Sequence, residues 1–293
     1  MKEKNVIGIA SDTTMLLGLN GYIKEDCLVI DDVMCASRKH TLEEDCEAFV
    51  HRFSLEGERM AVAAVSAYRC GGMEIPKLSR QEAKDMLHWQ LEDTLEWDKD
   101  TYYSDFMLTA REEAGEKAGT DYLYWVVLPK VHVDALATGY FRGGGDVRII
   151  DYWPSPLSRV FEETGAKALV WPEGEGWRLT VWRQDICYVS LYSGADEASL
   201  RQALQEAEQA IFLVGLSGID GIYAYTEAVP YDGTGIEASE QVFPESLYNE
   251  YGMLSHASYQ CTNRAVTYEE KGSMLWDMAL GLVRRGLGIK TYD

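Results

Sequence analysis

Near its start the chain carries the run Val6-Ile7-Gly8-Ile9-Ala10-Ser11-Asp12-Thr13-Thr14-Met15-Leu16-Leu17-Gly18-Leu19. Two apolar runs flank a short polar segment, which is the pattern of a buried strand, a turn and a second strand. The same pattern returns at 168–183, where apolar runs flank Pro172-Glu173-Gly174-Glu175-Gly176. The repetition predicts an α/β protein made of two units that each begin with a hairpin. On pattern alone, a generic mixed α/β fold accounts for it about as well.

Helix signals follow each hairpin. Thr41 and Ser79 each precede a Glu by three residues, the spacing of a capping box, and predict helix starts there. The second of these helices carries an apolar face over 83–95. A last helix is predicted at 273–285, ending at Gly286.

Two further segments predict strands and turns. Asn20-Gly21 lies between apolar runs and predicts a two-residue hairpin turn, because both residues tolerate positive φ. The apolar run at 210–216 predicts a core strand by its length.

Bulk composition excludes several classes of function. The chain has 293 residues, 46% of them apolar, and a formal net charge of −21. That charge disfavours nucleic acid and direct adhesion to anionic lipid, although it permits a basic protein partner. No apolar run reaches the length of a membrane span and no secretory signal is present, so we expect a soluble, cytoplasmic chain with no direct membrane insertion.

Metal and catalytic motifs are missing from the sequence. The six cysteines are scattered without a C-x-x-C pair, and the five histidines form no H-x-x-x-H pair. No Ser-His-Asp, nucleophile-elbow or Walker pattern appears. We therefore expect reduced thiols, no metal site and no catalytic residue.

Three blocks resemble the PilM-type pilus assembly proteins, in order along nearly the whole chain. The first is the helix with Ser79-Arg80-Gln81-Glu82-Ala83 and Trp89-Gln90-Leu91-Glu92-Asp93-Thr94-Leu95-Glu96-Trp97. The second is Val126-Val127-Leu128-Pro129-Lys130 followed by Asp151-Tyr152-Trp153-Pro154. The third is the tail Ala279-Leu280-Gly281-Leu282-Val283-Arg284-Arg285-Gly286. The cytoplasmic domain of type II secretion L-type proteins is similar but continues into a membrane span.

The resemblance implies an actin-like (ribonuclease H-like, duplicated) α/β fold. Its halves would be 1–164, with an inserted subdomain at about 71–145, and 165–293, with the last helix, 273–286, packing back on the first half. Gly165 is the expected hinge. The implied role is a non-catalytic scaffold of a type IV pilus, DNA-uptake or secretion platform, peripheral to the inner membrane. It would bind the short cytosolic N-terminal tail of a bitopic membrane protein and stand near the assembly ATPase.

In such a fold, three loops would bind ATP and Mg²⁺. The candidates here are Gly8, Thr13 and Thr14 in the first loop, Gly174 and Gly176 in the second, and Gly215 and Gly218 in the third. Ala10 stands where an acid should organise the metal, and Asp12 would face the phosphates. Pro172 lacks an N–H, and Leu216 replaces a glycine. We expect a degenerate cleft, with ATP weak or absent as a cofactor, and an ordinary strand-to-helix turn accounts for 215–221 at least as well.

Partner-binding residues are predicted on the 79–97 helix, where His88, Trp89 and Trp97 are candidates for a groove lining. The alternative is that both tryptophans belong to the core. Two other functions stay open. One is an ATPase or phosphotransferase of the same superfold, and the other is a cell-division type homologue that polymerises or binds membrane.

Overall fold

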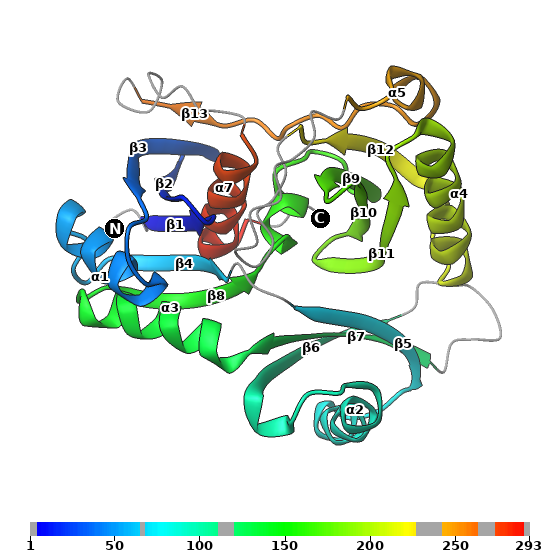
Figure 1. Cartoon of the computed structure of the whole chain (residues 1–293), viewed down its shortest axis with the longest axis horizontal. Coiled ribbons are helices and arrows are strands. Elements are labelled where there is room, and N and C mark those ends of the chain that lie inside the picture. The colour runs from blue at the N-terminus through cyan, green and yellow to red at the C-terminus, as the bar shows by residue number, and fades with distance from the viewer. Residues whose placement is uncertain (1–4, 65–67, 111–119, 227–241, 263–272, 290–293) are drawn as a thin grey trace.

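The computed structural model describes residues 5–64, 68–110, 120–226, 242–262 and 273–289. These residues form two sheets that repeat one design and a third, smaller sheet that is inserted into the first (Figure 1). The two hairpin-led units expected from the sequence are therefore present.

The first sheet is built around the opening hairpin. Its strands are β1 (Val6–Ser11), β2 (Met15–Lys24), β3 (Cys27–Ser37), β4 (Arg59–Ala64), β8 (Asp146–Tyr152) and β13 (Gln260–Cys261), in the order β13-β3-β2-β1-β4-β8. β1 is antiparallel to β2 and parallel to β4. Helices α1 (Leu42–Phe53) and α3 (Lys130–Arg142) pack together on one face of this sheet, as Figure 1 shows.

The second sheet repeats this arrangement. It contains β9 (Ala166–Glu173), β10 (Gly176–Arg183), β11 (Ile186–Gly194) and β12 (Ile219–Ala224), in the order β11-β10-β9-β12. The order matches β3-β2-β1-β4 strand for strand. Helix α4 (Glu197–Leu213) lies between β11 and β12 in the chain, just as α1 lies between β3 and β4. The short helices η2 (Ser155–Arg159) and α5 (Glu245–Tyr251) lie before and after this unit in the chain.

The inserted unit runs from β5 (Arg69–Pro76) to β7 (Thr120–Pro129). It also holds α2 (Arg80–Thr94), η1 (Lys99–Thr101) and β6 (Tyr102–Ala110), and its sheet has the order β5-β7-β6. The capping boxes at Thr41 and Ser79 are both formed. The unit is shorter than the expected 71–145 because α3 packs on α1 and so belongs with the first sheet.

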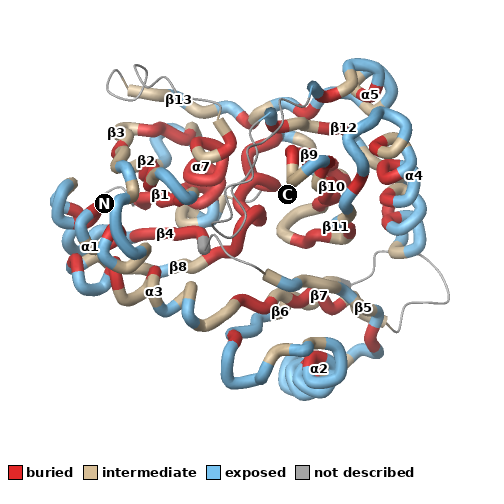
Figure 2. Tube along the Cα trace, in the orientation of Figure 1, coloured by how far each residue is buried: buried red, intermediate tan, exposed pale blue. Residues whose placement is uncertain are grey.

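The last described segments return to the first unit. β13 pairs with β3, and α7 (Met274–Leu287) lies against β1 and β2 on the face opposite α1. Figure 2 shows the buried residues of α7 and β1 in one continuous region. The approach is close, because a Cβ added at Gly8 would lie 2.3 Å from the carbonyl oxygen of Ala279.

Three local predictions are wrong. Asn20-Gly21 lies inside β2, and the turn is made by Glu25 and Asp26, whose φ angles are 51° and 61°. Gly21 instead makes room for α7, since a Cβ there would lie 2.5 Å from Cγ1 of Val283.

The run 210–216 is not a strand. It forms the last turn of α4 and a helix stop, with Ile211 buried while Phe212 and Leu213 are each 73% exposed. The strand lies later, at Ile219–Ala224. The last helix likewise ends later than predicted, because Gly288, with φ 75°, caps it in place of Gly286.

Candidate functional site

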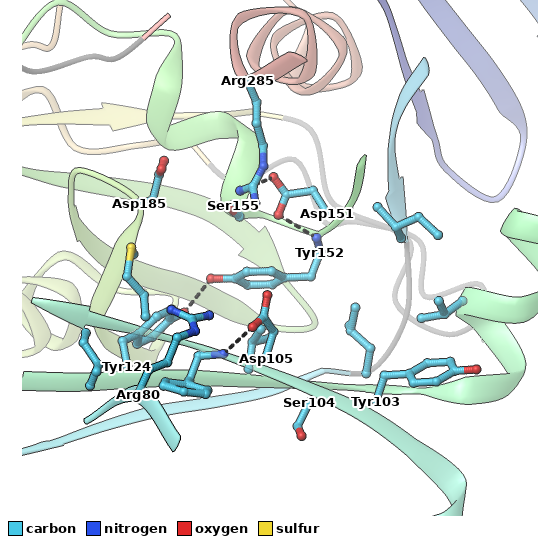
Figure 3. A pocket seen from close by; sticks show the side chains of 17 residues that line it. Arg80, Tyr103, Ser104, Asp105, Tyr124, Asp151, Tyr152, Ser155, Asp185 and Arg285 are labelled. Atoms are coloured by element: carbon cyan, nitrogen blue, oxygen red, sulfur yellow. Dashed lines mark hydrogen bonds and ion pairs between the residues drawn. The ribbon is translucent and has the colours of Figure 1, made fainter. Parts of the chain in front are cut away.

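A groove lies between the inserted sheet and the first sheet. Its volume is about 480 Å³. It is lined by residues of β6, β7 and β8, with contributions from α2, α3, η2, the β10–β11 turn and α7 (Figure 3). Three parts of the chain that are distant in sequence therefore meet at this groove.

Two strand edges border the groove. β6 ends the inserted sheet and β8 ends the first sheet in the strand orders of the described residues. All six residues of 103–108 on β6 line the groove. Because successive side chains of a strand point to opposite faces, such a continuous lining means that the groove meets the edge of β6. An edge presents backbone N–H and C=O groups that an extended peptide can pair with.

Part of the groove wall is apolar. Val126 and Leu128 come from β7, and Ile150 comes from β8. The hydroxyls of Tyr124 and Tyr152 hydrogen-bond to each other from opposite walls, as Figure 3 shows. Burial raises the pKa of both phenols well above the ordinary value, so both stay neutral at physiological pH.

Most charges at the groove are already paired. Asp151 Oδ2 accepts hydrogen bonds from Arg159 Nη1 at 2.8 Å and from Arg285 Nη1 at 3.1 Å. Arg159 Nε also donates to Asp185 Oδ1 at 2.7 Å. Burial alone would lower the pKa of Arg159, and the carboxylates of Asp151 and Asp185 together raise it above its ordinary value. This cluster ties β8, η2, α7 and the β10–β11 turn together.

Two charged side chains of the inserted unit, Asp105 and Arg80, do not belong to this cluster. The Asp105 carboxylate accepts a hydrogen bond from the following backbone N–H, of Phe106, at 2.8 Å, and the Arg80 guanidinium lies 4.8 Å from the centroid of the Phe106 ring. Neither side chain has an ion-pair partner in the described part of the chain. Both are therefore available to a ligand in the groove.

The predicted partner-binding residues lie elsewhere. Helix α2 packs on the face of the inserted sheet that presents Leu123, Trp125 and Val127, whereas the groove is lined by Tyr124, Val126 and Leu128 of the alternate face. His88 and Trp89 are exposed on α2, with Trp89 68% exposed, so they do not line the groove and Trp89 is not a core residue either.

Trp97 is half-buried against the core beneath α2. Its ring lies 6.4 Å from that of Tyr102, and the Arg69 guanidinium lies 5.4 Å from its centroid. The sequence did contain a signal for the groove: the unbroken apolar run at 122–128 indicates a strand that is covered on both faces.

In the first predicted phosphate loop, the side chain of Asp12 hydrogen-bonds to the residues that follow it in the loop. Asp12 Oδ1 accepts hydrogen bonds from the backbone N–H of Thr14 at 2.6 Å and of Met15 at 2.7 Å, and from the Thr14 hydroxyl at 2.8 Å. The carboxylate thus occupies donors that an anionic ligand at this turn would use. Gly8 lies three residues before the turn, in mid-strand, where its lack of a side chain admits α7.

The second predicted loop is the β9–β10 turn. Gly174 has φ 60°, a conformation that glycine adopts without strain. A Cβ at Gly176 would lie 2.0 Å from the carbonyl oxygen of Ser193 on β11. Glu173 pairs with Arg178, whose Nε lies 2.8 Å from Glu173 Oε2. Local backbone geometry accounts for both glycines.

The third predicted loop is far from the second. Gly215 caps α4: its N–H donates to the carbonyl of Phe212 at 3.0 Å, and the N–H of Leu216 donates to that of Ile211 at 3.0 Å, as in a Schellman motif. The segment therefore leads from a helix into a strand, opposite to the expected strand-to-helix turn.

Strand pairing fixes the separation of these glycines. β12 runs parallel to β9, and Ile219 pairs with Ala166 at the start of β9. Gly215 and Gly218 thus lie at one end of the sheet and Gly174 and Gly176 at the other, roughly 20 Å away for a strand of this length. The structure does not bring these four glycines together, so the prediction that they share one site is wrong.

The described residues hold neither a metal-binding cluster nor a helix that could cross a membrane. No group of three or more His, Cys, Asp or Glu side chains in these ranges is arranged to hold a metal ion. Among the described helices, none combines the length and the apolar character needed to cross a bilayer.

The matching strand orders of the two sheets, the inserted sheet and the returning last helix define a duplicated actin-like α/β fold. Comparison with solved structures agrees. A chain of the "PilM-PilN type IV pilus biogenesis complex" superposes with a TM-score of 0.61 at 13% identity, over 96% of this chain and 98% of that one. No protein-family model and no curated protein matches the sequence.

Two further structures are similar at a lower level. The cytoplasmic domain of EpsL, an inner-membrane component of the type II secretion system of Vibrio cholerae, gives a TM-score of 0.47 at 14% identity over 94% of both chains. A Bacteroides thetaiotaomicron protein of unknown function with an actin-like ATPase fold gives 0.41 at 10% identity, over 90% of this chain and 92% of that one. The strand orders and the match to the pilus-complex chain confirm the fold expected from the sequence.

Proposed function

We propose that this protein is a non-catalytic actin-like scaffold of a type IV pilus or related secretion platform. It binds the short cytosolic tail of a membrane protein in the groove between β6 and β8. The observation that carries the proposal is this groove, which is bordered by two strand edges and has apolar side chains on part of its wall. The fold shared with a chain of a pilus biogenesis complex supports it.

The groove favours a particular kind of tail. A strand-like peptide would pair its backbone with an edge and bury apolar side chains against Val126, Leu128 and Ile150. A basic residue of the peptide would meet Asp105, the unpaired acid of the groove. The net charge of −21 would attract such a basic tail at long range.

The lack of catalysis is supported by the first loop. Asp12 fills the N–H donors of the first turn with its own carboxylate, so the phosphate of a nucleotide would have to displace that carboxylate. The scaffold role would place the protein in the cytoplasm, held at the inner membrane by its partner.

The test is titration calorimetry with synthetic peptides that carry the cytosolic N-terminal tails of single-span pilus and secretion proteins from the same organism. We expect one tail to bind saturably. Asp105→Lys should weaken that binding about tenfold or more, because it replaces an attraction by a repulsion at the groove. Ile150→Glu should weaken it further by placing a charge on the apolar wall.

Trp89→Ala is the matched control, since Trp89 is exposed on α2, away from the groove. Its binding should equal that of the wild type. Equal binding by both groove variants, in samples that unfold cooperatively, would contradict the proposal. Failure of every tail to bind would do the same.

A further inference from the structure

The inserted unit has an apolar core of its own, separate from the larger apolar clusters of the other two sheets. Its buried residues are Ile75, Ala83, Leu87, Leu91, Tyr102, Leu123, Trp125 and Val127. The chain joins this unit to the first sheet at two places, before β5 and after β7. A unit with its own core and two connections can tilt as a rigid body unless contacts with its neighbours prevent it.

Two tyrosines of the inserted sheet that are not fully buried contact these neighbours. Tyr122 of β7 stacks on Tyr188 of β11, with ring centroids 5.3 Å apart. The hydroxyl of Tyr103, which is 46% exposed, donates to Asp134 Oδ1 of α3 at 3.0 Å. A hydrogen bond that water can reach restrains a unit less than a buried one, because water competes for both groups.

A third contact is buried and joins the two walls of the groove. Tyr124 of β7 and Tyr152 of β8 are 3% and 6% exposed, and their hydroxyls hydrogen-bond to each other (Figure 3). Each hydroxyl has one proton, so one donates and the other accepts. In such a low-dielectric site the bond is stronger, and the loss of a partner costs more, than at the surface. This pair is therefore well placed to fix how far the inserted sheet lies from β8.

We infer that Tyr124 and Tyr152 are positioning residues of the groove: their hydrogen bond fixes the separation of its walls and thereby sets how tightly the groove holds a peptide. The effect on peptide affinity rests on the proposed function, whereas the fixed separation can be measured without a peptide. A groove whose walls move between several separations is competent to bind for only part of the time. Its apparent affinity falls in proportion to that fraction.

Two variants separate positioning from stability. Tyr124→Phe leaves the Tyr152 hydroxyl buried without its present partner, so this variant should melt about 2–4 °C below the wild type. In the double variant Tyr124→Phe/Tyr152→Phe neither hydroxyl is left over, so most of that stability should return. The walls stay unpinned in both variants. Stability and peptide affinity should therefore respond differently to the second substitution.

The first measurement is calorimetric titration with the synthetic tail peptide that binds the wild type. We expect both variants to bind about fivefold more weakly, as a competent fraction of about one fifth implies. Tyr192→Phe is the matched control, since it removes a hydroxyl from an exposed side chain of β11 and should bind like the wild type. A double variant that binds as tightly as the wild type would overturn the inference and leave the pair a purely structural role.

The second measurement uses the free protein. Spin labels carried by an unnatural amino acid in place of Ala48 and Lys84, which are exposed on α1 and α2, report the distance between the first and inserted units by double electron–electron resonance. The double variant should give a broader distance distribution than the wild type. An unchanged distribution would overturn the inference, since weaker binding would then come from a lost contact with the peptide itself. If no tail binds at all, the proposed function fails and the distance distribution alone decides the inference.

Discussion

Lys167 is a basic residue in an environment that disfavours its positive charge. It lies on β9, fully buried, and its ammonium nitrogen has no hydrogen-bond partner in the described ranges. Burial lowers the pKa of Lys167 from 10.5 to about 8. The nearest charges are mixed, because Glu163 and Asp185 favour the ammonium while Arg284 and Arg159 oppose it. At pH 7 the folded protein therefore carries a charge that would be better solvated in the unfolded chain.

Lys167→Met should raise the free energy of unfolding at pH 7, by up to about 3 kcal/mol if the pKa difference is fully relieved. Between pH 8 and 10.5 the unfolded wild type binds more protons than the folded one, so its stability rises with pH through that window. The advantage of the variant should therefore shrink from pH 7 to pH 10. Urea denaturation at both pH values measures it.

Lys84→Met, at an exposed position of α2, is the control and should change stability little at either pH. An equal gain for Lys167→Met at pH 7 and pH 10 would show that the gain comes from packing and not from the buried charge.

At the scale of elements, glycines set the distance between α7 and the first sheet. Gly8 and Gly21 do so for β1 and β2, and Gly281 does the same for η2, since a Cβ there would lie 2.0 Å from the carbonyl oxygen of Pro156. Gly286 differs, since the three atoms nearest to its Cβ would all belong to the Val6 side chain, with Cγ1 at 2.4 Å. Backbone atoms cannot give way as a side chain can, so these positions differ in what they tolerate.

Gly8→Ala should lower the free energy of unfolding by about 3 kcal/mol or more, because α7 must move off β1 and uncover apolar surface. Gly286→Ala should cost far less, since Val6 can shift and alanine favours the helix. Chemical denaturation of the two variants compares them directly. A smaller loss for Gly8→Ala than for Gly286→Ala would mean that this contact does not limit the packing.

Features that depend on residues close together in the sequence could be predicted, whereas features that depend on contacts between distant residues could not. The capping boxes at Thr41 and Ser79 are local, and both helices begin where expected. Asn20-Gly21 misled because its glycine serves a contact with α7, more than 250 positions later in the chain. The run 210–216 misled because apolar residues at a helix end look like a short strand.

The site was harder to predict than the fold for the same reason. The groove forms when β6, β7, β8 and the β10–β11 turn come together. Of these, β7 carries a sequence signal, its apolar run at 122–128, which indicates a strand covered on both faces but does not say what covers it. Trp89 was predicted to line the groove because it is an aromatic residue on an amphipathic helix. In the structure, α2 packs on the face of the inserted sheet that is opposite the groove, because successive side chains of β7 point to opposite faces.

For the whole molecule, the main question is whether nucleotide controls its shape. The two sheets keep the duplicated design, but Asp12 occupies the N–H donors of the first turn with its own carboxylate. A charge-assisted hydrogen bond contributes roughly 1.5–3 kcal/mol, so the loss of two weakens binding by roughly two to four decades. We therefore expect the arrangement of the two halves not to change with the level of ATP.

We expect calorimetric titration of the purified protein with Mg-ATP at low millimolar concentration to give no saturable binding. The same sample should unfold cooperatively on heating, at an unchanged temperature when Mg-ATP is added. Saturable micromolar binding, or a clear rise in melting temperature, would contradict the degenerate-loop interpretation and return an ATPase to consideration.

Because α7 packs on the first sheet, the strands of that sheet are synthesised well before the helix that covers them. β8 ends at Tyr152, but α7 begins only at Met274, 122 positions later. At 5–20 residues per second, translation needs roughly 6–24 s to cover that distance. During that interval the face of β1 and β2 that α7 will cover is open to solvent. The nascent chain therefore offers a chaperone an apolar surface until α7 has been synthesised, and a product that stops before α7 would keep that surface exposed.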